Sequence, residues 1–259
     1  MERIDLHVHT LASDGSDAPE TVVRKAAAAG LRAVAITDHD TFAGLPEALA
    51  AGTARGIEVV PGVELSTVWG GEEVHLLGYY MDTDNAALRA LMTRATDERN
   101  ARNETMVQRL HDAGYPITMA ELHAAFPGQT VLGRGKRFYV PRYNIPLEDS
   151  VRALRAAGGV PVVAHLFKYR FDDAQRTAML SAAADAGALG LEVRYTTYTP
   201  EQTAAAQALA ERFGLAPSGG SDYHGLRKPD IALGSGRGDL CVPYAYLAGV
   251  KTLAGRGCV

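Results

Sequence analysis

Clusters of potential metal ligands recur where apolar runs end in this chain, and they constrain the fold more than any other feature. Five clusters lie at Asp5–Asp14, Asp38–Asp40, Glu64–His75, His165 and Asp222–His224. They hold six of the eight histidines. In α/β proteins the loops at the carboxyl ends of strands converge on one face, where ligands bind. The pattern therefore predicts an α/β fold in which residues far apart in sequence share one site.

The types of side chain in these clusters narrow the choice of metal. Imidazole and carboxylate groups without a thiolate suit zinc, manganese or iron. Taken singly, each cluster has an ordinary explanation. His7 and His9 share one strand face and could form a polar surface patch. Asp38 and His39 could form a turn and a helix cap, and His165 could be a core histidine. Recurrence of the same residue types at the same topological position favours a shared metal centre.

Length and composition exclude several classes of protein. The 259 residues suffice for one α/β barrel or two small domains, and a hydrophobic fraction of 47% is ordinary for a globular chain. No apolar run reaches the length of a membrane span and the N-terminal residues do not resemble a signal peptide, so we expect a cytoplasmic protein without a membrane partner. Cys241 and Cys258 are the only cysteines, which excludes a disulfide scaffold or a thiolate zinc site.

The formal net charge of -4 argues against duplex nucleic acid as the main partner, because such binding depends on basic surface. The charge is compatible with a small phosphorylated substrate held by a few local positive groups and by metal ions. The sequence carries no signal for an oligomeric state.

Strand and helix patterns alternate on both sides of a different central stretch. Short connections between them predict parallel strands and about seven strand–helix units. The predicted strands are Ile4–Val8, Ala33–Thr37, Ile57–Val63, Val74–Tyr80, Val160–Ala164, Leu189–Val193 and Leu215–Ser218. The predicted helices begin at Pro19, Leu45, Leu147, Asp172 and Pro200, and most of them end at a glycine.

Residues 85–145 follow a different pattern. Asn85–Ala113 reads as one long polar helix, and Met119–Ala125 as a short helix. Leu132–Pro141 is rich in glycine and arginine, and could serve as a lid with phosphate contacts or as a solvated face. We therefore expect a barrel domain over residues 1–84 and 146–259, with a small, mostly helical insertion over residues 85–145.

Five ordered motifs carry a family resemblance. They are DLHVHT with the following SDG, AITDHDT, PGVELS followed by HLLGY, GGVPVVAH and PSGGSDYHG. With these motifs the chain resembles the PHP (polymerase and histidinol phosphatase) family, in particular its stand-alone phosphoesterases, some of which act on nucleotides such as 3',5'-bisphosphates. The resemblance implies a distorted (β/α)7 barrel, two or three divalent ions (manganese, iron or zinc) at its mouth, and hydrolysis of phosphate esters.

The same resemblance implies nine metal ligands. They are His7, His9, Asp14, His39, Glu64, His75, His165, Asp222 and His224. Glu64 could bridge two ions. Asp222 and His224 are also candidate catalytic groups that move a proton, although the ligand and acid roles compete for the same lone pairs.

The chain departs from these relatives at one point of the insertion. The relatives usually carry an Arg-x-His segment there, whose histidine contributes to the site. Here Gln129–Leu132 runs directly into Gly133–Arg142, so the segment is read as absent. We expect one ion to be held less firmly as a result.

Positive side chains after the predicted strands are candidates for phosphate recognition. Lys168, Arg170 and Arg194 could each hold a phosphate, and a solvated surface position is an equally good explanation. Tyr195, Tyr198 and Tyr223 could stack on a base or could be packing residues.

These residues permit one main reaction. Metal ions lower the pKa of a bound water, and the resulting hydroxide would attack phosphorus in line. We expect a metal-dependent phosphoesterase that hydrolyses a phosphate monoester of a small molecule, a nucleotide such as a 3',5'-bisphosphate or a sugar phosphate. The alternatives are a non-catalytic, metal-stabilised binding module and an exonuclease on short single-stranded nucleic acid.

Overall fold

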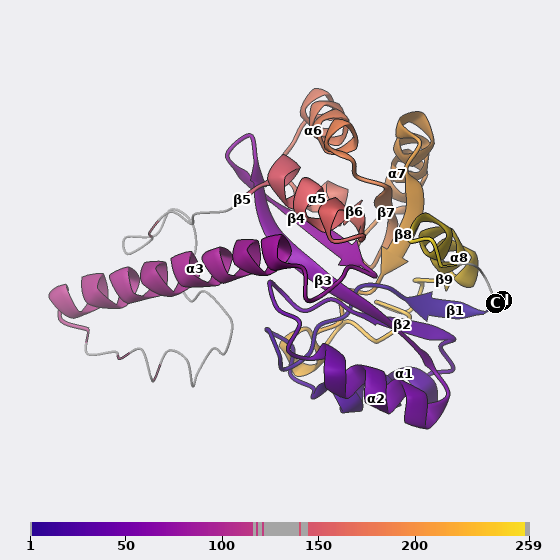
Figure 1. The fold of residues 1–259 in the computed structure, drawn as a ribbon, viewed down its shortest axis with the longest axis horizontal. Helices are drawn as coiled ribbons and strands as arrows, with labels where there is room; N and C mark the ends of the chain where they lie inside the picture. The colour runs from indigo at the N-terminus through magenta and orange to yellow at the C-terminus, as the bar shows by residue number, and fades with distance from the viewer. Residues whose placement is uncertain (1, 116–117, 119–120, 122–139, 141–144, 257–259) are drawn as a thin grey trace.

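The computed structural model describes residues 2–115, 118, 121, 140 and 145–256. Within them the chain forms a mixed α/β fold, in which a nine-stranded sheet curls into a nearly closed barrel with helices packed outside (Figure 1). The strand order is β8-β7-β6-β4-β3-β2-β1-β9, and β5 pairs with β3 beside this path. The predicted distorted barrel is confirmed.

The first strands are parallel and are connected by helices, as predicted. β1 (Arg3–Asp5), β2 (Ala33–Ile36) and β3 (Glu58–Trp69) pair in register, with α1 (Pro19–Ala28) and α2 (Leu45–Arg55) between them. Along β2 the side chains alternate between the helix-covered core and the barrel interior, because successive residues of a strand face opposite sides. This alternation fixes which side chains at the strand end can reach a shared site.

The prediction of parallel pairing is wrong for β4 (Glu72–Tyr79). It runs antiparallel to β3 and also to β6 (Val160–Val163). Gly70 and Gly71 connect β3 to β4 with positive φ angles of 57° and 79°, the conformation of a tight hairpin turn. A two-residue connection leaves no room for the crossover that a parallel pair needs.

The second half returns to parallel pairing. β6, β7 (Gly190–Tyr195) and β8 (Ala216–Gly220) are parallel. They alternate with α5 (Leu147–Ala156), α6 (Asp173–Ala186) and α7 (Pro200–Phe213). Asp172 and Thr199 cap α6 and α7 through reciprocal capping boxes, which satisfy backbone donors that would otherwise lack partners. The chain then adds β9 (Val242–Pro243), antiparallel to β1, and α8 (Tyr244–Leu253), which the sequence analysis did not predict.

Contacts between β1 and β8 draw the two ends of the sheet together. Leu6 N–H donates to Gly219 O at 3.1 Å, and beyond the strands Asp222 N–H donates to His7 O at 2.8 Å. A Cβ atom on Gly220 would stand 2.4 Å from His7 Cβ, so glycine is needed for this approach. The closure brings the first and last ligand clusters side by side.

The barrel interior is filled by apolar side chains rather than open. Leu6, Leu77, Tyr79 and Val162 are fully buried there, and Tyr79 donates a hydrogen bond to Leu6 O at 2.8 Å. This packed layer forms the floor beneath the ligand clusters.

The long helix expected after residue 85 is confirmed. α3 spans Ala86–Asp112. Asn85 caps its N-terminus, because the Asn85 side chain accepts a hydrogen bond from Leu88 N–H at 3.1 Å. Figure 1 shows this helix projecting away from the barrel. Apart from Glu121, the expected short helix at Met119–Ala125 lies outside the described residues. The next described element is β5 (Ile145–Pro146). The division into barrel and insertion stays a prediction.

Within the described part of the chain, no helix is both long enough and apolar enough to cross a membrane.

Candidate metal centre

The nine predicted ligands gather at one end of the barrel. Their ligand atoms form four overlapping groups in which all atoms lie within 4.8 Å of one another. The groups are His9, Asp14, His39 and His224; His7, Glu64 and His165; His7, His9 and Asp222; and His39, Glu64 and His75. Residues that follow strands and residues within the β3–β4 hairpin thus unite all five sequence clusters.

The Glu64 carboxylate lies at the middle of the cluster. Its Oε1 is 2.9 Å from His75 Nδ1 and 3.0 Å from His165 Nε2. Its Oε2 is 3.1 Å from His7 Nε2 and 3.0 Å from His9 Nε2. His39 Nε2 is also near Oε2, at 3.4 Å. Each oxygen thus lies near a different set of histidines, which is the arrangement expected of a carboxylate that can bridge two ions.

Two further carboxylates complete the cluster. Asp222 Oδ1 is 3.4 Å from both His9 Nε2 and His224 Nδ1. Asp14 Oδ1 is 3.2 Å from His224 Nε2. The cluster therefore combines three carboxylates with six imidazoles.

The donor atoms fit metal ions better than they fit one another. His7 Nε2, both ring nitrogens of His9 and His165 Nδ1 are buried without a hydrogen-bond partner. Such orphaned buried nitrogens cost free energy unless another partner satisfies them. The separations of 3.0–3.4 Å around Glu64 Oε2 are close to the ligand–ligand distance of about 3.4 Å that tetrahedral coordination at about 2.1 Å requires. The described donor set therefore suits bound divalent cations.

The carboxylates and burial push the histidine pKa values apart. Burial lowers the pKa of His7, but the charges of Glu64, Glu192 and Asp222 outweigh it and hold the pKa well above its usual value. Burial lowers the pKa of His165 to about 3 and that of His39 well below its usual value. His39 and His165 are therefore neutral and ready to bind a cation, whereas His7 must first lose a proton.

Glu192 belongs to the site, and the sequence analysis missed it. It is fully buried on β7, where its Oε1 lies 3.1 Å from His7 Nδ1 and its Oε2 accepts a hydrogen bond from His165 N–H at 2.7 Å. Burial raises the pKa of this carboxyl. A carboxylate behind a ligand imidazole fixes the tautomer and the ring orientation. The available signal was a charged residue inside the apolar run Leu189–Val193.

Asp38 supports the site differently from a simple turn or cap. Its carboxylate accepts hydrogen bonds from Thr10 N–H at 2.7 Å and Ser13 Oγ at 2.6 Å. It therefore fixes the loop that carries Asp14. Asp40 accepts from Ser66 N–H at 2.9 Å and forms an ion pair with Arg99 of α3.

Backbone strain is concentrated at the site. Asp40, His165 and Asp222 have positive φ angles of 49°, 24° and 57°, and Tyr80 is the one other non-glycine residue of this kind among the described residues. Such conformations cost about 1–3 kcal/mol each and cluster at functional sites. Here they lie in the turns after β2, β6 and β8, within or next to the ligand cluster.

The cationic side chains fall into two groups. Lys168 Nζ lies 3.6 Å from Asp222 Oδ2, and Lys228, which the sequence analysis did not single out, lies 2.7 Å from the same oxygen. Arg170 is exposed. Arg194 donates to Tyr246 OH at 3.4 Å and lines a separate pocket of about 320 Å³. Substrate contacts by Lys168, Arg170 and Arg194 stay a prediction.

Only one edge of the cluster meets solvent. The side chains of Asp14, His39 and His75 are 17%, 19% and 21% exposed, whereas those of His7, Glu64 and His165 are at most 4% exposed. The Asp14–His39–His75 edge is therefore the part of the cluster that solvent reaches.

A barrel that collects imidazoles and carboxylates at one end defines a class, the metal-dependent hydrolases. Residues 5–184 match the PHP domain, which is more than half of the chain, so the chain belongs to the PHP domain family. It is a hydrolase acting on phosphoester bonds.

Curated relatives from bacteria share this class of reaction by name. The 5'-3' exoribonuclease Rnm of Salmonella typhimurium is 31% identical over 252 residues, covering 85% of this chain and 84% of that protein. The 3',5'-nucleoside bisphosphate phosphatase of Chromobacterium violaceum is 32% identical over 255 residues, covering 86% and 88%. A phosphoribosyl 1,2-cyclic phosphate 1,2-diphosphodiesterase of Eggerthella lenta is 31% identical and covers 85% of this chain and 94% of that enzyme.

Solved structures agree with the fold. A protein from Bifidobacterium adolescentis described as a metal-dependent phosphoesterase superposes with a TM-score of 0.85 at 28% identity, covering 100% of this chain and 97% of that chain. A protein from Chromobacterium violaceum described as an amidohydrolase, with bound sulfate and no metal, has a TM-score of 0.79 at 30% identity, covering 98% and 96%. The comparisons thus support the fold.

The substitution Glu192→Gln is expected to weaken metal binding about 10–100-fold. A glutamine offers one acceptor where Glu192 accepts from both the His7 ring and the His165 backbone, so one contact must be lost. Calorimetric titration of manganese into metal-free protein measures the effect, and Glu201→Gln on the exposed surface of α7 is the control. Equal affinities for the two variants would exclude Glu192 from the site.

The metal-free site is expected to bind cations more tightly as pH rises towards 9. Burial lowers the pKa of His75, but Glu64 and Glu73 outweigh it and raise the pKa to about 9. A proton therefore occupies His75 below that pH and must leave before the ring can bind a metal.

NMR titration of the histidine ring protons in metal-free protein tests this. Glu73→Gln should lower the pKa of His75, and Glu72→Gln, on the other face of the strand, should leave it in place. A His75 pKa that is the same in the wild type and in Glu73→Gln would contradict this assignment.

Proposed function

We propose that this phosphoesterase removes a terminal phosphate from a small nucleotide of the 3',5'-bisphosphate kind. The observation that carries the proposal is the Glu64-centred cluster with two lysines beside Asp222. The cluster supplies sites for cations, and the lysines supply fixed positive charge for a phosphoryl group. The bisphosphate phosphatase among the relatives supports the substrate class.

Two or three ions of manganese, iron or zinc fit the donor set. Four overlapping groups would hold them: His9, Asp14, His39 and His224; His7, Glu64 and His165; His7, His9 and Asp222; and His39, Glu64 and His75. When bound, such ions lower the pKa of water and neutralise phosphoryl charge. Gln129–Leu132 and most of Gly133–Arg142 lie outside the described residues, so the weaker hold on one ion stays a prediction.

The side chains around Asp222 orient its carboxylate. Tyr195 OH donates to Asp222 Oδ2 at 2.7 Å, and Lys228 contacts the same oxygen, so Oδ1 is left to face the histidines. Lys168 and Lys228 can then reach outward to phosphoryl oxygens. His224 Nδ1 lies 2.9 Å from Asp222 O, which places its Nε2 toward Asp14 and favours the ligand role over proton transfer.

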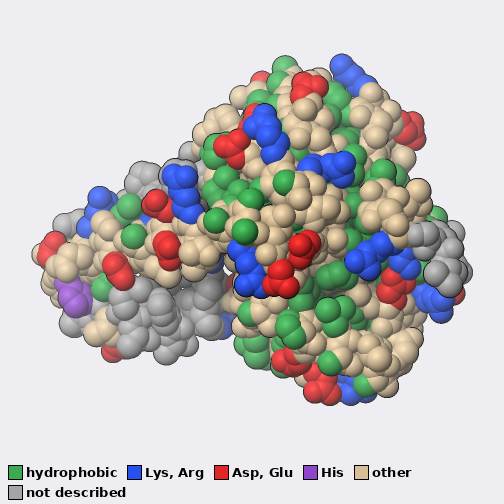
Figure 2. Space-filling model, in the orientation of Figure 1, with side chains coloured by type: hydrophobic (Ala, Val, Ile, Leu, Met, Phe, Trp, Pro, Cys, Tyr) green, Lys and Arg blue, Asp and Glu red, His purple; other side chains and the backbone are tan. Residues whose placement is uncertain are grey.

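A second candidate is exonucleolytic cleavage of short RNA. The exoribonuclease relatives favour it. The charge of the chain favours the small substrate over RNA, because binding of a nucleic acid depends on basic surface. The net charge is -4. On the face seen in Figure 2, basic and acidic side chains are interspersed rather than gathered into a basic track.

A substrate screen with added manganese is expected to show phosphate release from adenosine 3',5'-bisphosphate at a higher kcat/KM than from 5'-phosphorylated RNA oligonucleotides. His7→Ala and Asp222→Ala should lower kcat/KM at least about 100-fold, because each removes a ligand of a shared ion. His111→Ala, a histidine on α3 outside the cluster, is the matched control.

Faster release of mononucleotides from the oligonucleotides would instead assign the exonuclease reaction. Activity that survives both ligand substitutions would contradict the metal-dependent mechanism.

A further inference from the structure

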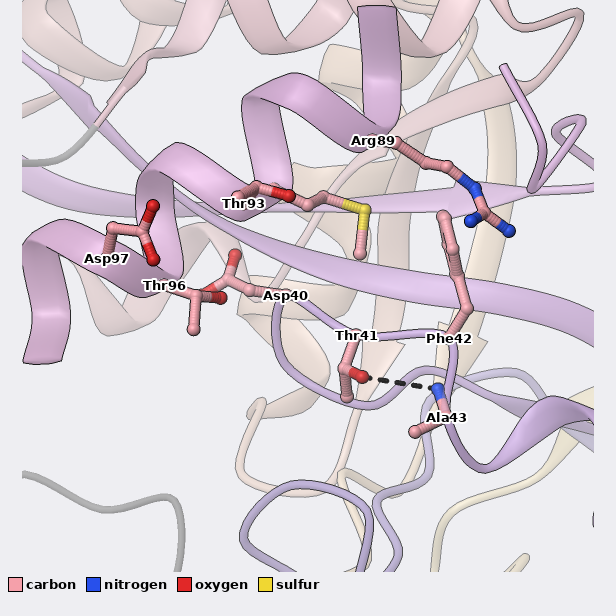
Figure 3. A pocket seen from close by; sticks show the side chains of 9 residues that line it. Asp40, Thr41, Phe42, Ala43, Arg89, Thr93, Thr96 and Asp97 are labelled. Atoms are coloured by element: carbon pink, nitrogen blue, oxygen red, sulfur yellow. Dashed lines mark hydrogen bonds between the residues drawn. The ribbon is translucent and has the colours of Figure 1, made fainter. Parts of the chain in front are cut away.

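A pocket of about 470 Å³ lies between the loop after β2 and the first half of α3. Figure 3 shows Phe42 directed from the loop toward the helix, with Thr93, Thr96 and Asp97 on the helix side. Its volume is within the range of about 300–1,000 Å³ typical of small-molecule sites. None of the roles assigned above uses this pocket.

The pocket begins one residue from the candidate metal centre. Asp40, which lines it, directly follows His39, and Asp40 N–H donates to Glu64 O at 2.9 Å. The ion pair between Asp40 and Arg99 holds α3 against this loop. His39 is also part of the exposed edge of the cluster. A ligand that presents its phosphate at this edge can therefore extend into the pocket.

The walls favour an uncharged, flat group. Phe42 is half-buried and Met92 is buried, so together they offer an aromatic ring and a polarisable sulfur. Thr93 and Thr96 add hydroxyl groups, and Asp97 adds a carboxylate that can only accept hydrogen bonds. The walls thus combine a stacking surface with acceptors for N–H groups.

A second phosphate does not fit these walls. The one cation that lines the pocket among the described residues is Arg89, which already donates to Thr83 O at 2.7 Å and to Asp84 Oδ1 at 2.5 Å. The carboxylates of Asp40 and Asp97 would repel a further anion.

We infer that this pocket binds the nucleobase of the substrate while its phosphate lies at the Glu64 cluster. The inference rests on the proposed nucleotide substrate and adds where the base is recognised. Phe42 and Met92 hold the face of the base, and the threonines and Asp97 accept hydrogen bonds from its amino and ring N–H groups. A base that carries an exocyclic amino group is therefore preferred.

Filling the pocket tests the inference. Thr93 is exposed on α3, so Thr93→Phe can occupy the pocket without disturbing the core. Thr105→Phe makes the same change at an exposed position of the same helix outside the pocket. Binding of adenosine, which has no phosphate, is followed by ligand-observed NMR on the purified protein, and KM for adenosine 3',5'-bisphosphate is measured in parallel.

We expect adenosine to bind the wild-type protein and Thr105→Phe alike. Thr93→Phe should weaken this binding and raise KM about tenfold or more, as expected for the loss of a stacked base. Circular dichroism melting of both variants checks that folding is unchanged.

Two results would overturn the inference: no adenosine binding by the wild-type protein, or equal binding by wild-type and Thr93→Phe. A third result is adenosine binding in the expected manner without hydrolysis of any phosphorylated compound. This result would contradict the proposed function and would still support base binding in the pocket. Failure of the pocket and failure of the reaction are thereby distinguished.

Discussion

The Glu64 carboxylate is 1% exposed and faces five imidazoles at 2.9–3.4 Å. A lone buried carboxylate costs several kcal/mol in lost hydration, so it persists only with compensating positive charge. Burial raises its pKa, yet the surrounding histidines hold the pKa well below its usual value. The geometry therefore keeps a negative charge at the centre of a buried pocket, and that charge attracts cations.

The rest of the fold supplies what this charge requires. β3 places Glu64 between β2 and β4, so that His39 pairs with it across one side while the hairpin brings His75 to the other. Closure of the sheet through Leu6 and Gly219 adds His7, His9, Asp222 and His224. Behind them Glu192 and Asp38 fix ring and loop positions through hydrogen bonds. Cations that bind the folded protein but not the unfolded chain would also raise the free energy of unfolding.

Much of this site could be predicted from the sequence, because most of the ligands follow strands that the sequence shows as apolar runs. Glu64 and His75 instead lie within β3 and β4. The geometry brings all nine candidate ligands together. Glu192 escaped prediction because it stands inside an apolar strand, where only burial and its partner His7 reveal its role. Lys228 escaped because it follows a short turn of helix with no strand signal.

The fold was predictable to a similar extent. The parallel units followed from strand–helix alternation, whereas the β3–β4 hairpin was missed although Gly70-Gly71 is a hairpin signal. β9 is two residues long and gives no periodicity to detect. The pocket beside Phe42 could not be foreseen either, because it depends on the approach of α3 to the Asp40 loop through Arg99, a contact between residues 59 positions apart.

Metal analysis of the purified protein beside Glu64→Gln tests the central claim most directly. A glutamine keeps the shape of the side chain, but it removes the charge and replaces one ligand oxygen with an amide nitrogen, so both the attraction for cations and the bridge through two oxygens are lost. Elemental analysis after dialysis should find at least two divalent ions per wild-type chain, and fewer than one in the variant, with circular dichroism showing the same fold. Equal metal content in the two proteins, or none in the wild type after growth with manganese, iron and zinc, would contradict a metal centre built around this carboxylate.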